Sequence, residues 1–286
     1  MNEPINHHYL PVFYLRQWCN ADGKIVRYYR PHSKVVAKPI TPKQTGYEPH
    51  LYALDGLPLD QRQQIEKHYM APVVDDPASR ALQILMARST PHPTVEVRTD
   101  WVRFLMSLSL RDPATVAKNT ADAKAGLIAK LNMNPEEYEA ARGADDPPTF
   151  VEWIQVNDPY RLNNIGKEML PALIENEKVG TIMMQMRWFV FDLVSSGITL
   201  LTCDRPYIRI FGLKDERCVI VLPISPRLAF IATHSEGTAE RLLKAGIKFL
   251  AKEINARIVA QAVSHVYGST TNHLLFVENR LDPVAH

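Results

Sequence analysis

His8 and Asp204 are the two side chains of this sequence that we expect to take part in catalysis. His7 and His8 precede Pro11 and a stretch rich in aromatic residues, which can hold an imidazole in a fixed position. A histidine held in this way can act as a general base near neutral pH or as a metal ligand. The alternative is a structural histidine whose ring nitrogens bond backbone carbonyls, and this alternative is stronger for His7.

Asp204 lies at the end of an apolar run that is typical of a strand, directly before Arg205 and Pro206. Polar residues that follow a strand often point off the sheet into a cleft. From such a position a carboxylate can bind a metal, orient a histidine or accept hydrogen bonds from a substrate. The competing interpretation is that Asp204 caps its own turn by accepting hydrogen bonds from backbone N–H groups.

Arg16 and Arg111 are the predicted contacts for an anionic substrate. Each lies beside apolar segments that must pack, so its position is restricted. A guanidinium can bind a phosphate or a carboxylate through two hydrogen bonds. The alternative is an ion pair with a buried carboxylate such as Glu66 or Asp112, because charges in a protein interior need partners.

Asn255 completes the predicted substrate-binding residues. It lies on a long helical segment, ten residues before His265. Ten residues of α-helix place two side chains about 80° apart around the axis. These two side chains are therefore not expected to face one small site. Ser225 is not expected to be a nucleophile, because no G-x-S-x-G elbow surrounds it.

The net charge of +2 is distributed unevenly along the chain. Residues 1–50 contain 7 Lys/Arg and 3 Asp/Glu, residues 51–204 contain 15 and 21, and residues 205–286 contain 11 and 7. The two ends are basic and the middle is acidic. If the ends meet in the fold, they form a mildly basic face suited to an anionic ligand or nucleic acid. Chance clustering on a solvated surface is the alternative.

Several familiar kinds of site are missing from the sequence. It contains no Walker loop, no G-x-G-x-x-G after a strand, no H-E-x-x-H and no zinc-deaminase signature. Its 3 cysteines show no C-x-x-C spacing, so reduced and mostly buried thiols are expected. The N-terminal residues do not resemble a secretory signal and no window is apolar enough for a membrane helix, which predicts a cytoplasmic protein without membrane contact.

The hydrophobic periodicity predicts an α+β fold in a single intertwined domain with two lobes. The sheet lobe comprises residues 1–58 and 181–286, and the helical lobe comprises residues 59–180. Its mostly antiparallel sheet is expected to combine strands at 24–30, 186–194, 198–203, 219–222, 228–233 and 273–277, with Ser196-Gly197 as the hairpin turn between the second and third. Helices are expected at 59–70, 78–87 and 95–131, interrupted at Pro72 and Pro113, then from Asn134 onward and, as one long C-terminal helix, at 239–263.

Four short motifs recur in an order that is typical of one family. They are His-His-Tyr-Leu-Pro at 7–11, Leu-Thr-Cys-Asp-Arg-Pro at 201–206, Leu-Pro-Ile-Ser-Pro at 222–226 and His-Val-Tyr at 265–267. With them the chain resembles the bacterial family called domain of unknown function 4238, which implies a shared fold and a shared polar site but no activity. The family usually has Ser where Cys203 stands, Asn where Arg205 stands and often a glutamate near Asp75 or Asp76. A nucleophilic role for Cys203 is therefore not expected.

These features lead to two hypotheses from different classes. The first is a hydrolase acting on a phosphodiester or nucleotide, with or without a divalent metal. In it His8 is the base or a metal ligand, Asp204 a ligand or orienting group and Arg16 an anion clamp. The second is a non-enzymatic regulatory module that binds nucleic acid or a protein through the basic face. Direct cooperation of His8 with Asp204 requires that both side chains reach one cleft.

Overall fold

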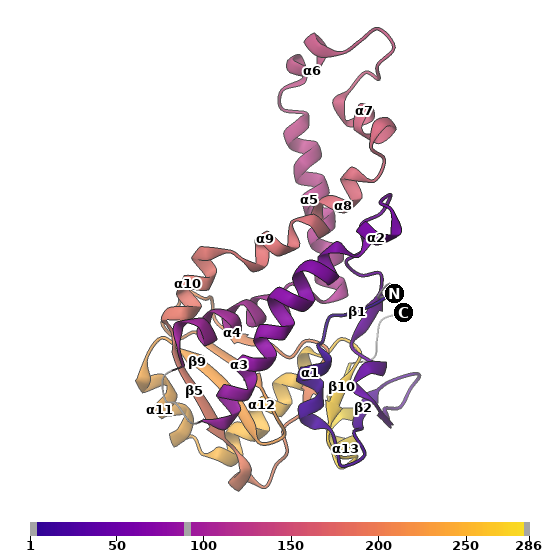
Figure 1. Cartoon of the computed structure of the whole chain (residues 1–286). Helices are drawn as coiled ribbons and strands as arrows, with labels where there is room; N and C mark the ends of the chain where they lie inside the picture. The colour runs from indigo at the N-terminus through magenta and orange to yellow at the C-terminus, as the bar shows by residue number, and fades with distance from the viewer. Residues whose placement is uncertain (1–4, 89–92, 283–286) are drawn as a thin grey trace.

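Strands in the described residues, 5–88 and 93–282 of the computed structural model, form two four-stranded sheets and one two-stranded sheet (Figure 1). The first sheet has the order β3 (Val36–Ile40), β2 (Ile25–Tyr29), β10 (Val266–Gly268) and β6 (Thr202–Cys203). The second has the order β5 (Arg187–Asp192), β9 (Leu228–Thr233), β8 (Val219–Pro223) and β7 (Ile208–Ile210). The short sheet pairs β1 (Asn6–His8) with β4 (Tyr47–Pro49).

The first sheet joins segments from the two ends of the chain. Tyr28 of β2 is paired with Val266 of β10, and Cys203 of β6 is paired with Val266 from the other side. The two basic ends of the sequence therefore meet in one layer. Every strand pairing is antiparallel among the described residues, which confirms the predicted α+β class with antiparallel sheets.

The middle of the chain is helical, as predicted. Its helices are α2 (Leu59–Arg62), a π-helix (Glu66–Asp75), α3 (Asp76–Ala87), α4 (Val95–Leu108), α5 (Pro113–Leu131), α6 (Pro135–Ala141), α7 (Phe150–Asn157), α8 (Arg161–Glu168), α9 (Leu170–Ile174) and α10 (Glu177–Gln185). Outside this region lie α1 (Val12–Leu15), α11 (Glu236–Lys244), α12 (Ile247–Gln261) and α13 (Leu274–Glu278), with short 3-10 turns at Arg16–Trp18, Pro42–Gln44 and Val194–Ser196. Across the described part of the chain, no helix combines the length and apolar character needed to cross a membrane.

Alternating apolar side chains place the second sheet between two helical layers. In β9, Phe230 belongs to a buried cluster that also contains Trp101 and Phe104 of α4. The next residue, Ile231, belongs to a different cluster that contains Ile254 of α12. Successive residues of a strand point to opposite faces, so this alternation buries both faces of β9. The second sheet is thus covered by α4 on one side and by α12 on the other.

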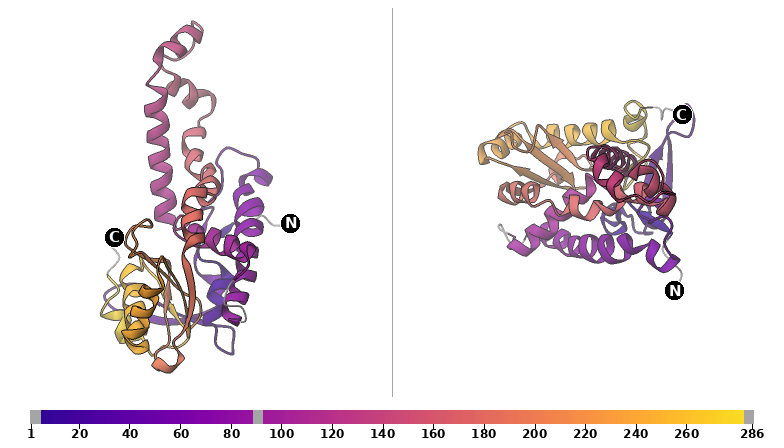
Figure 2. Two further views of the ribbon diagram at one scale, coloured as in Figure 1. Left: turned by 90° about the vertical axis from the view of Figure 1, so that its left-hand side faces the viewer. Right: turned by 90° about the horizontal axis from the view of Figure 1, so that it is seen from above.

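Helices α5 to α8 form an arm that projects from the body of the molecule (Figures 1 and 2). The arm begins where the sequence predicts a break, because Pro113 cannot continue a helix from α4. The Asp112 carboxylate accepts a hydrogen bond from the Thr115 N–H and so caps α5. The chain therefore turns out of the body at a well-defined point.

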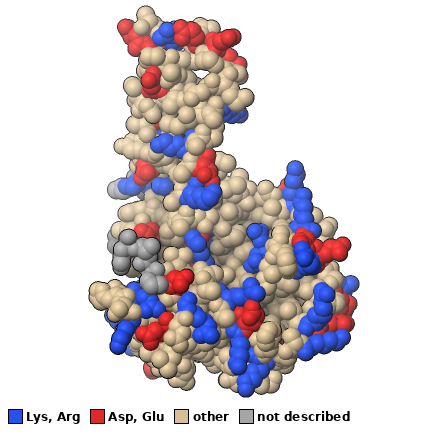
Figure 3. Space-filling model, turned by 180° about the vertical axis from the view of Figure 1, so that it is seen from behind, with Lys and Arg blue, Asp and Glu red and all other residues tan. Residues whose placement is uncertain are grey.

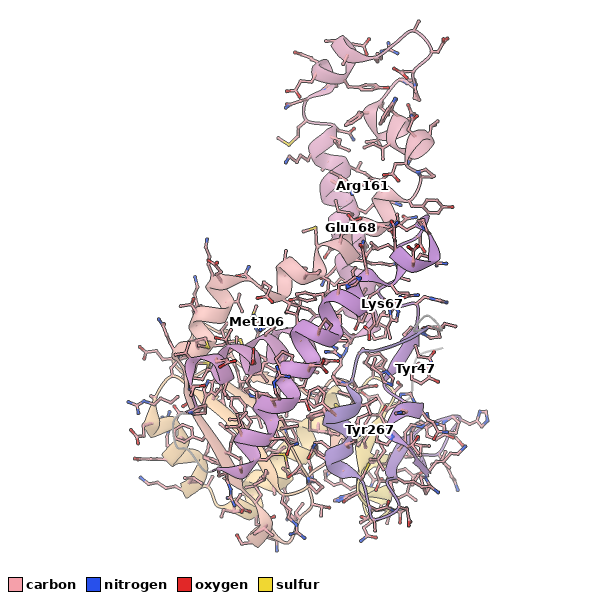
Figure 4. All side chains as sticks on the ribbon, viewed as in Figure 1. Tyr47, Lys67, Met106, Arg161, Glu168 and Tyr267 are labelled. Atoms are coloured by element: carbon pink, nitrogen blue, oxygen red, sulfur yellow. The ribbon has the colours of Figure 1, made fainter. Side chains whose placement is uncertain are left out.

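Helices α5 and α8 lie side by side at the base of the arm. Gly166 approaches α5 so closely that a Cβ atom on it would lie 2.2 Å from the Cα of Thr120. Arg161 and Glu168, labelled in Figure 4, form an ion pair at 3.1 Å along α8. The absence of a side chain at position 166 therefore lets the two helices pack at this distance.

Two predicted strands differ from the structure. The strands at 186–194 and 198–203 do not form a hairpin, since β5 and β6 belong to different sheets. The turn at Val194–Ser196 leads the chain away from β5, and Leu200 and Leu201 become buried in a core cluster instead. The strand predicted at 273–277 is helix α13, and the last strand is β10.

Two helical predictions were also wrong in detail. The helix predicted at 239–263 is divided into α11 and α12 at Gly246, whose φ of +95° is accessible to glycine without strain. Pro72 does not interrupt its helix but lies inside the π-helix at Glu66–Asp75. Proline has no N–H to donate, and the wider π-helical turn accommodates it. The break predicted at Pro113 is confirmed.

Candidate functional site

Residues from distant parts of the chain line a small hollow of about 290 Å³, which we call the aromatic hollow. Its lining residues are Tyr9, Tyr47, Glu48, Asp112, Pro113, Ala114, Asp204, Arg205, Val263, Ser264 and His265. Three of the four motifs meet here, since they contribute Tyr9, Asp204 with Arg205, and His265. Figure 4 labels Tyr47 of β4, below the arm. The convergence of these motifs makes the aromatic hollow the candidate site.

Strand pairing brings Asp204 and His265 together. Asp204 follows β6 and His265 precedes β10, and these two strands are paired through Cys203 and Val266. The Asp204 N–H donates a hydrogen bond to the His265 carbonyl oxygen at 3.0 Å. The position of both residues is therefore fixed by the backbone of the first sheet.

The Asp204 carboxylate organises the turn that leads from α12 to β10. Its Oδ1 accepts a hydrogen bond from the N–H of Val263 at 2.9 Å. Its Oδ2 accepts hydrogen bonds from the N–H of Ser264 at 2.7 Å, the N–H of His265 at 2.9 Å and the Ser264 hydroxyl at 3.1 Å. Both carboxylate oxygens are thus engaged by the protein, so Asp204 is suited to orienting His265.

His265 lines the aromatic hollow and has one ring nitrogen that makes no hydrogen bond within the described residues. Its Nδ1 is 2.8 Å from the Ser264 hydroxyl, and its ring stacks on Tyr267 with centroids 6.2 Å apart. Among the described residues, no group hydrogen-bonds its Nε2. Burial lowers the pKa of His265, an effect that Asp204 opposes and Arg27 reinforces. The ring is therefore neutral at pH 7 and can accept a proton.

A second hollow of about 510 Å³ adjoins the first, and we call it the basic hollow. It is lined by Leu108, Ser109, Leu110, Asp112, Thr115, Arg205, Tyr207, Arg209 and Gln261. The two hollows share Asp112 and Arg205, whose ion pair has Nε–Oδ1 and Nη2–Oδ1 distances of 3.0 and 2.5 Å. Arg209 is exposed and makes no ion pair among the described residues. The Asp112–Arg205 ion pair therefore has the aromatic hollow on one side and the basic hollow on the other.

Arg111 is fully buried and pairs with a carboxylate, as one of the two interpretations of the sequence expected. Its Nη1 and Nη2 donate to the two oxygens of Asp75 at 2.8 and 3.1 Å. Nη2 also donates to the carbonyl oxygen of His8 at 2.7 Å. Asp75 ends the π-helix that begins with Glu66. Arg111 therefore joins the π-helix to β1 and is not available to a ligand.

His8 lies outside both hollows. Its ring meets the Tyr47 ring edge-on with centroids 5.5 Å apart, and burial together with the nearby Arg111 lowers its pKa. His7 is buried, stacks on Tyr52 and accepts a hydrogen bond from the Tyr52 N–H at 2.9 Å. Of the two residues predicted to act together, Asp204 lines the aromatic hollow and His8 does not.

Glu66 gives the buried cluster around Arg111 a pH dependence. Burial raises the pKa of its carboxyl from 4.5 to about 7, although Arg111 opposes the shift. Because its pKa is raised on folding, the protonated Glu66 carboxyl contributes to stability. This contribution is fully present below pH 4.5 and is lost as the pH rises to about 7. We therefore compare the free energy of unfolding of Glu66→Gln with that of the wild type at two pH values. The advantage of the variant over the wild type is expected to be larger at pH 8 than at pH 4.5, by on the order of 1–3 kcal/mol. Urea denaturation at several pH values measures this difference.

The matched control for this experiment is Glu216→Gln, which removes an exposed carboxyl. Its stability is expected to stay parallel to that of the wild type across the same pH range. Equal pH profiles for the Glu66 and Glu216 variants would show that Glu66 titrates as an ordinary surface group.

The other predicted substrate contacts lie apart from both hollows. Arg16 is exposed at the end of α1. Asn255 is buried on α12, where its Oδ1 accepts a hydrogen bond from the Leu201 N–H and its Nδ2 donates to the Thr199 carbonyl. Asn255 therefore links α12 to the segment before β6 and lines neither hollow. Ser225 caps the turn between β8 and β9 through its hydroxyl oxygen, as expected for a connecting residue.

The sequence interpretation missed Tyr9, Asp112 and Arg205 as site residues. Each is adjacent in sequence to a residue that was singled out, namely His8, Arg111 and Asp204, and of these three only Asp204 itself lines the aromatic hollow. No group of three or more His, Cys, Asp or Glu side chains in the described ranges could hold a metal ion. The 3 cysteines are free thiols, two of them buried, as predicted.

Comparison with known proteins gives one match. A profile of the family described as "Protein of unknown function (DUF4238)" matches residues 6–272, a range that includes every residue of both hollows. No curated protein and no solved structure matches the chain.

Proposed function

Since the chain belongs to the DUF4238 family, whose description gives no function, we propose from the geometry of its two hollows that it hydrolyses a phosphodiester or a nucleotide. The observation that carries this proposal is that His265, whose Nε2 makes no hydrogen bond within the described residues, and Arg205 line the same aromatic hollow. A neutral imidazole beside a fixed cation is the pair of groups that acid–base hydrolysis of a phosphate ester uses.

The proposed substrate spans the Asp112–Arg205 ion pair. Its phosphate lies at Arg205, where a guanidinium can donate charge-assisted hydrogen bonds. Its nucleoside occupies the aromatic hollow, where the partly exposed ring of Tyr47 is available for stacking. Tyr9 is buried, but its hydroxyl group, like that of Tyr47, has no hydrogen-bond partner among the described residues. The other side of the phosphate extends into the basic hollow, towards Arg209.

In the proposed reaction, a water molecule attacks the phosphorus atom and gives its proton to Nε2 of His265. The bond between phosphorus and the leaving oxygen breaks as the new bond forms. The leaving oxygen takes a proton from the Tyr9 hydroxyl, which recovers one from His265. Burial raises the pKa of Tyr9, so its phenol keeps its proton at neutral pH until this step. Asp204 acts as a positioning residue through the backbone of His265.

The test is an assay of DNA, RNA, cyclic and linear nucleotides, with and without Mg²⁺, Mn²⁺ or Zn²⁺. We expect His265→Gln to lower kcat by about 100-fold, the lower range for loss of a general base. Wild-type activity is expected to fall on the acid side, below pH 6.5, as His265 becomes protonated. Arg205→Asn, which introduces the residue usual in the family, is expected to act mainly on KM.

The control variant is His68→Gln, which replaces an exposed histidine outside both hollows. It is expected to retain wild-type kinetics. If no substrate is turned over while the wild type binds nucleic acid with a steep salt dependence, the protein is a binding module and the hydrolase proposal fails.

A further inference from the structure

The end of the arm carries an apolar pocket. The pocket, of about 480 Å³, lies between the end of α5, α6 and the start of α7, where Leu131, Pro135, Pro148 and Phe150 line it. Met133, two residues after Leu131 in sequence, is 77% exposed, and Val156 of α7 is 70% exposed. Exposed apolar surface marks an interaction site in many soluble proteins.

The same region holds the acidic excess of the middle part of the chain. Residues 132–160 contain seven acidic side chains and one basic one: Glu136, Glu137, Glu139, Asp145, Asp146, Glu152, Asp158 and Arg142. Arg142 is itself paired with Glu139 at 2.8 Å. Figure 3 shows acidic side chains gathered around the end of the arm. We call this surface, with its pocket, the acidic tip.

A surface of opposite character lies at the junction of α11 and α12. Leu243 is 48% exposed and Phe249 is 59% exposed on this junction. Residues 241–252 contain four basic side chains, Arg241, Lys244, Lys248 and Lys252, and are flanked by Glu240, which lies 3.9 Å from Lys244, and by Glu253. All four are exposed. We call this surface the basic junction.

We propose that the acidic tip of one molecule docks on the basic junction of a second copy, and that two copies exchange this contact reciprocally. The two surfaces match in both respects that matter, because each presents exposed apolar side chains among charges that are mostly of one sign, negative at the tip and positive at the junction. A reciprocal pair uses both surfaces of both molecules and closes on itself, which is the commonest symmetry of homo-oligomers. The apolar anchor that enters the tip pocket is Phe249, the more exposed of the two apolar side chains of the junction.

The contact can form only between molecules. The acidic tip and the basic junction lie at opposite ends of the molecule, with α6 at the top and α11 at the lower left of Figure 1. Nucleic acid is a poor occupant of the tip, because its phosphates would face uncompensated carboxylates. A second copy supplies the required basic and apolar surface from the same sequence.

The experiment is sedimentation velocity of the full chain over a range of concentrations. We expect a monomer–dimer equilibrium that weakens as salt is raised. Glu136→Lys and Lys248→Glu are each expected to weaken dimerisation at least about tenfold, because each reversal occurs in both contacts of the pair. Combining the two reversals in one chain is expected to restore part of the affinity. Phe249→Ala is expected to weaken it as well.

Lys178→Glu, on the exposed face of α10, is the matched control and should leave dimerisation unchanged. A chain that remains monomeric at about 100 µM, or a dimer indifferent to both charge reversals, overturns the proposal. Binding of a Lys-rich amphipathic peptide to the tip of a monomeric chain also overturns it and assigns the tip to a foreign partner. Assemblies larger than a dimer would exclude the reciprocal pair.

Discussion

Arg111→Met is expected to lower the free energy of unfolding by about 3–5 kcal/mol, the cost of removing one partner from a buried ion pair. The variant leaves the Asp75 carboxylate without its two donors and the His8 carbonyl without its Nη2 contact. Burial already raises the pKa of Asp75, and loss of the guanidinium removes the charge that opposes this shift. Urea denaturation followed by circular dichroism measures the change.

Two further variants serve as controls for this measurement. Arg80→Met removes an exposed guanidinium from α3 and is expected to stay within about 0.5 kcal/mol of the wild type. Arg111→Met combined with Asp75→Asn is expected to recover part of the loss, because the orphaned charge is gone. A loss of less than about 1 kcal/mol in Arg111→Met would show that the pair contributes little.

Asp204→Ala is expected to destabilise the protein by about 3 kcal/mol and to release the turn that carries His265. Three backbone N–H groups and one hydroxyl lose their common acceptor, and each buried donor left without a partner costs about 1–3 kcal/mol. The expected loss of stability is smaller than the sum of these costs because water reaches part of this turn. Urea denaturation measures the loss, and amide hydrogen exchange locates it.

In that experiment, faster exchange is expected at the N–H groups of Val263, Ser264 and His265, with the strands of the second sheet unaffected. Asp204→Asn is the matched variant, since an amide oxygen can still accept while the charge is lost, and it should show a smaller effect. Unchanged protection at all three amides in Asp204→Ala would mean that the turn is held by other contacts.

Local patterns in the sequence predicted those parts of the fold that depend on local interactions. The apolar run at 228–233 and the break at Pro113 specify β9 and the start of α5 without reference to the rest of the chain. The pairing of β2 with β10 could not be read in this way, because it depends on contacts between residues more than two hundred positions apart. The sheet to which residues 198–203 belong could not be read from the local sequence either, because it depends on the burial of Leu200 and Leu201 in a core cluster.

The motifs and Asp204 of the candidate site were predictable from the sequence, and its other side chains were not. The strand β1 ends at His8, and Tyr9, the next residue, lines the aromatic hollow while His8 does not. Sequence alone could not say which of these two neighbours shares the hollow with Asp204. His265 was set aside because it shares a helical segment with Asn255, but α12 ends at Gln261 and His265 belongs to the turn beyond it. The angle calculated for a continuous helix did not apply.

The close packing of α5 and α8 at Gly166 has a consequence for how the chain can vary in length. The arm leaves the body and returns to it at neighbouring points, so equal numbers of residues could be added to or removed from its two sides without moving the join. Each α-helical residue adds about 1.5 Å to such an arm. The arm is thus a spacer of adjustable reach, and its length sets the separation between the body and whatever its end contacts.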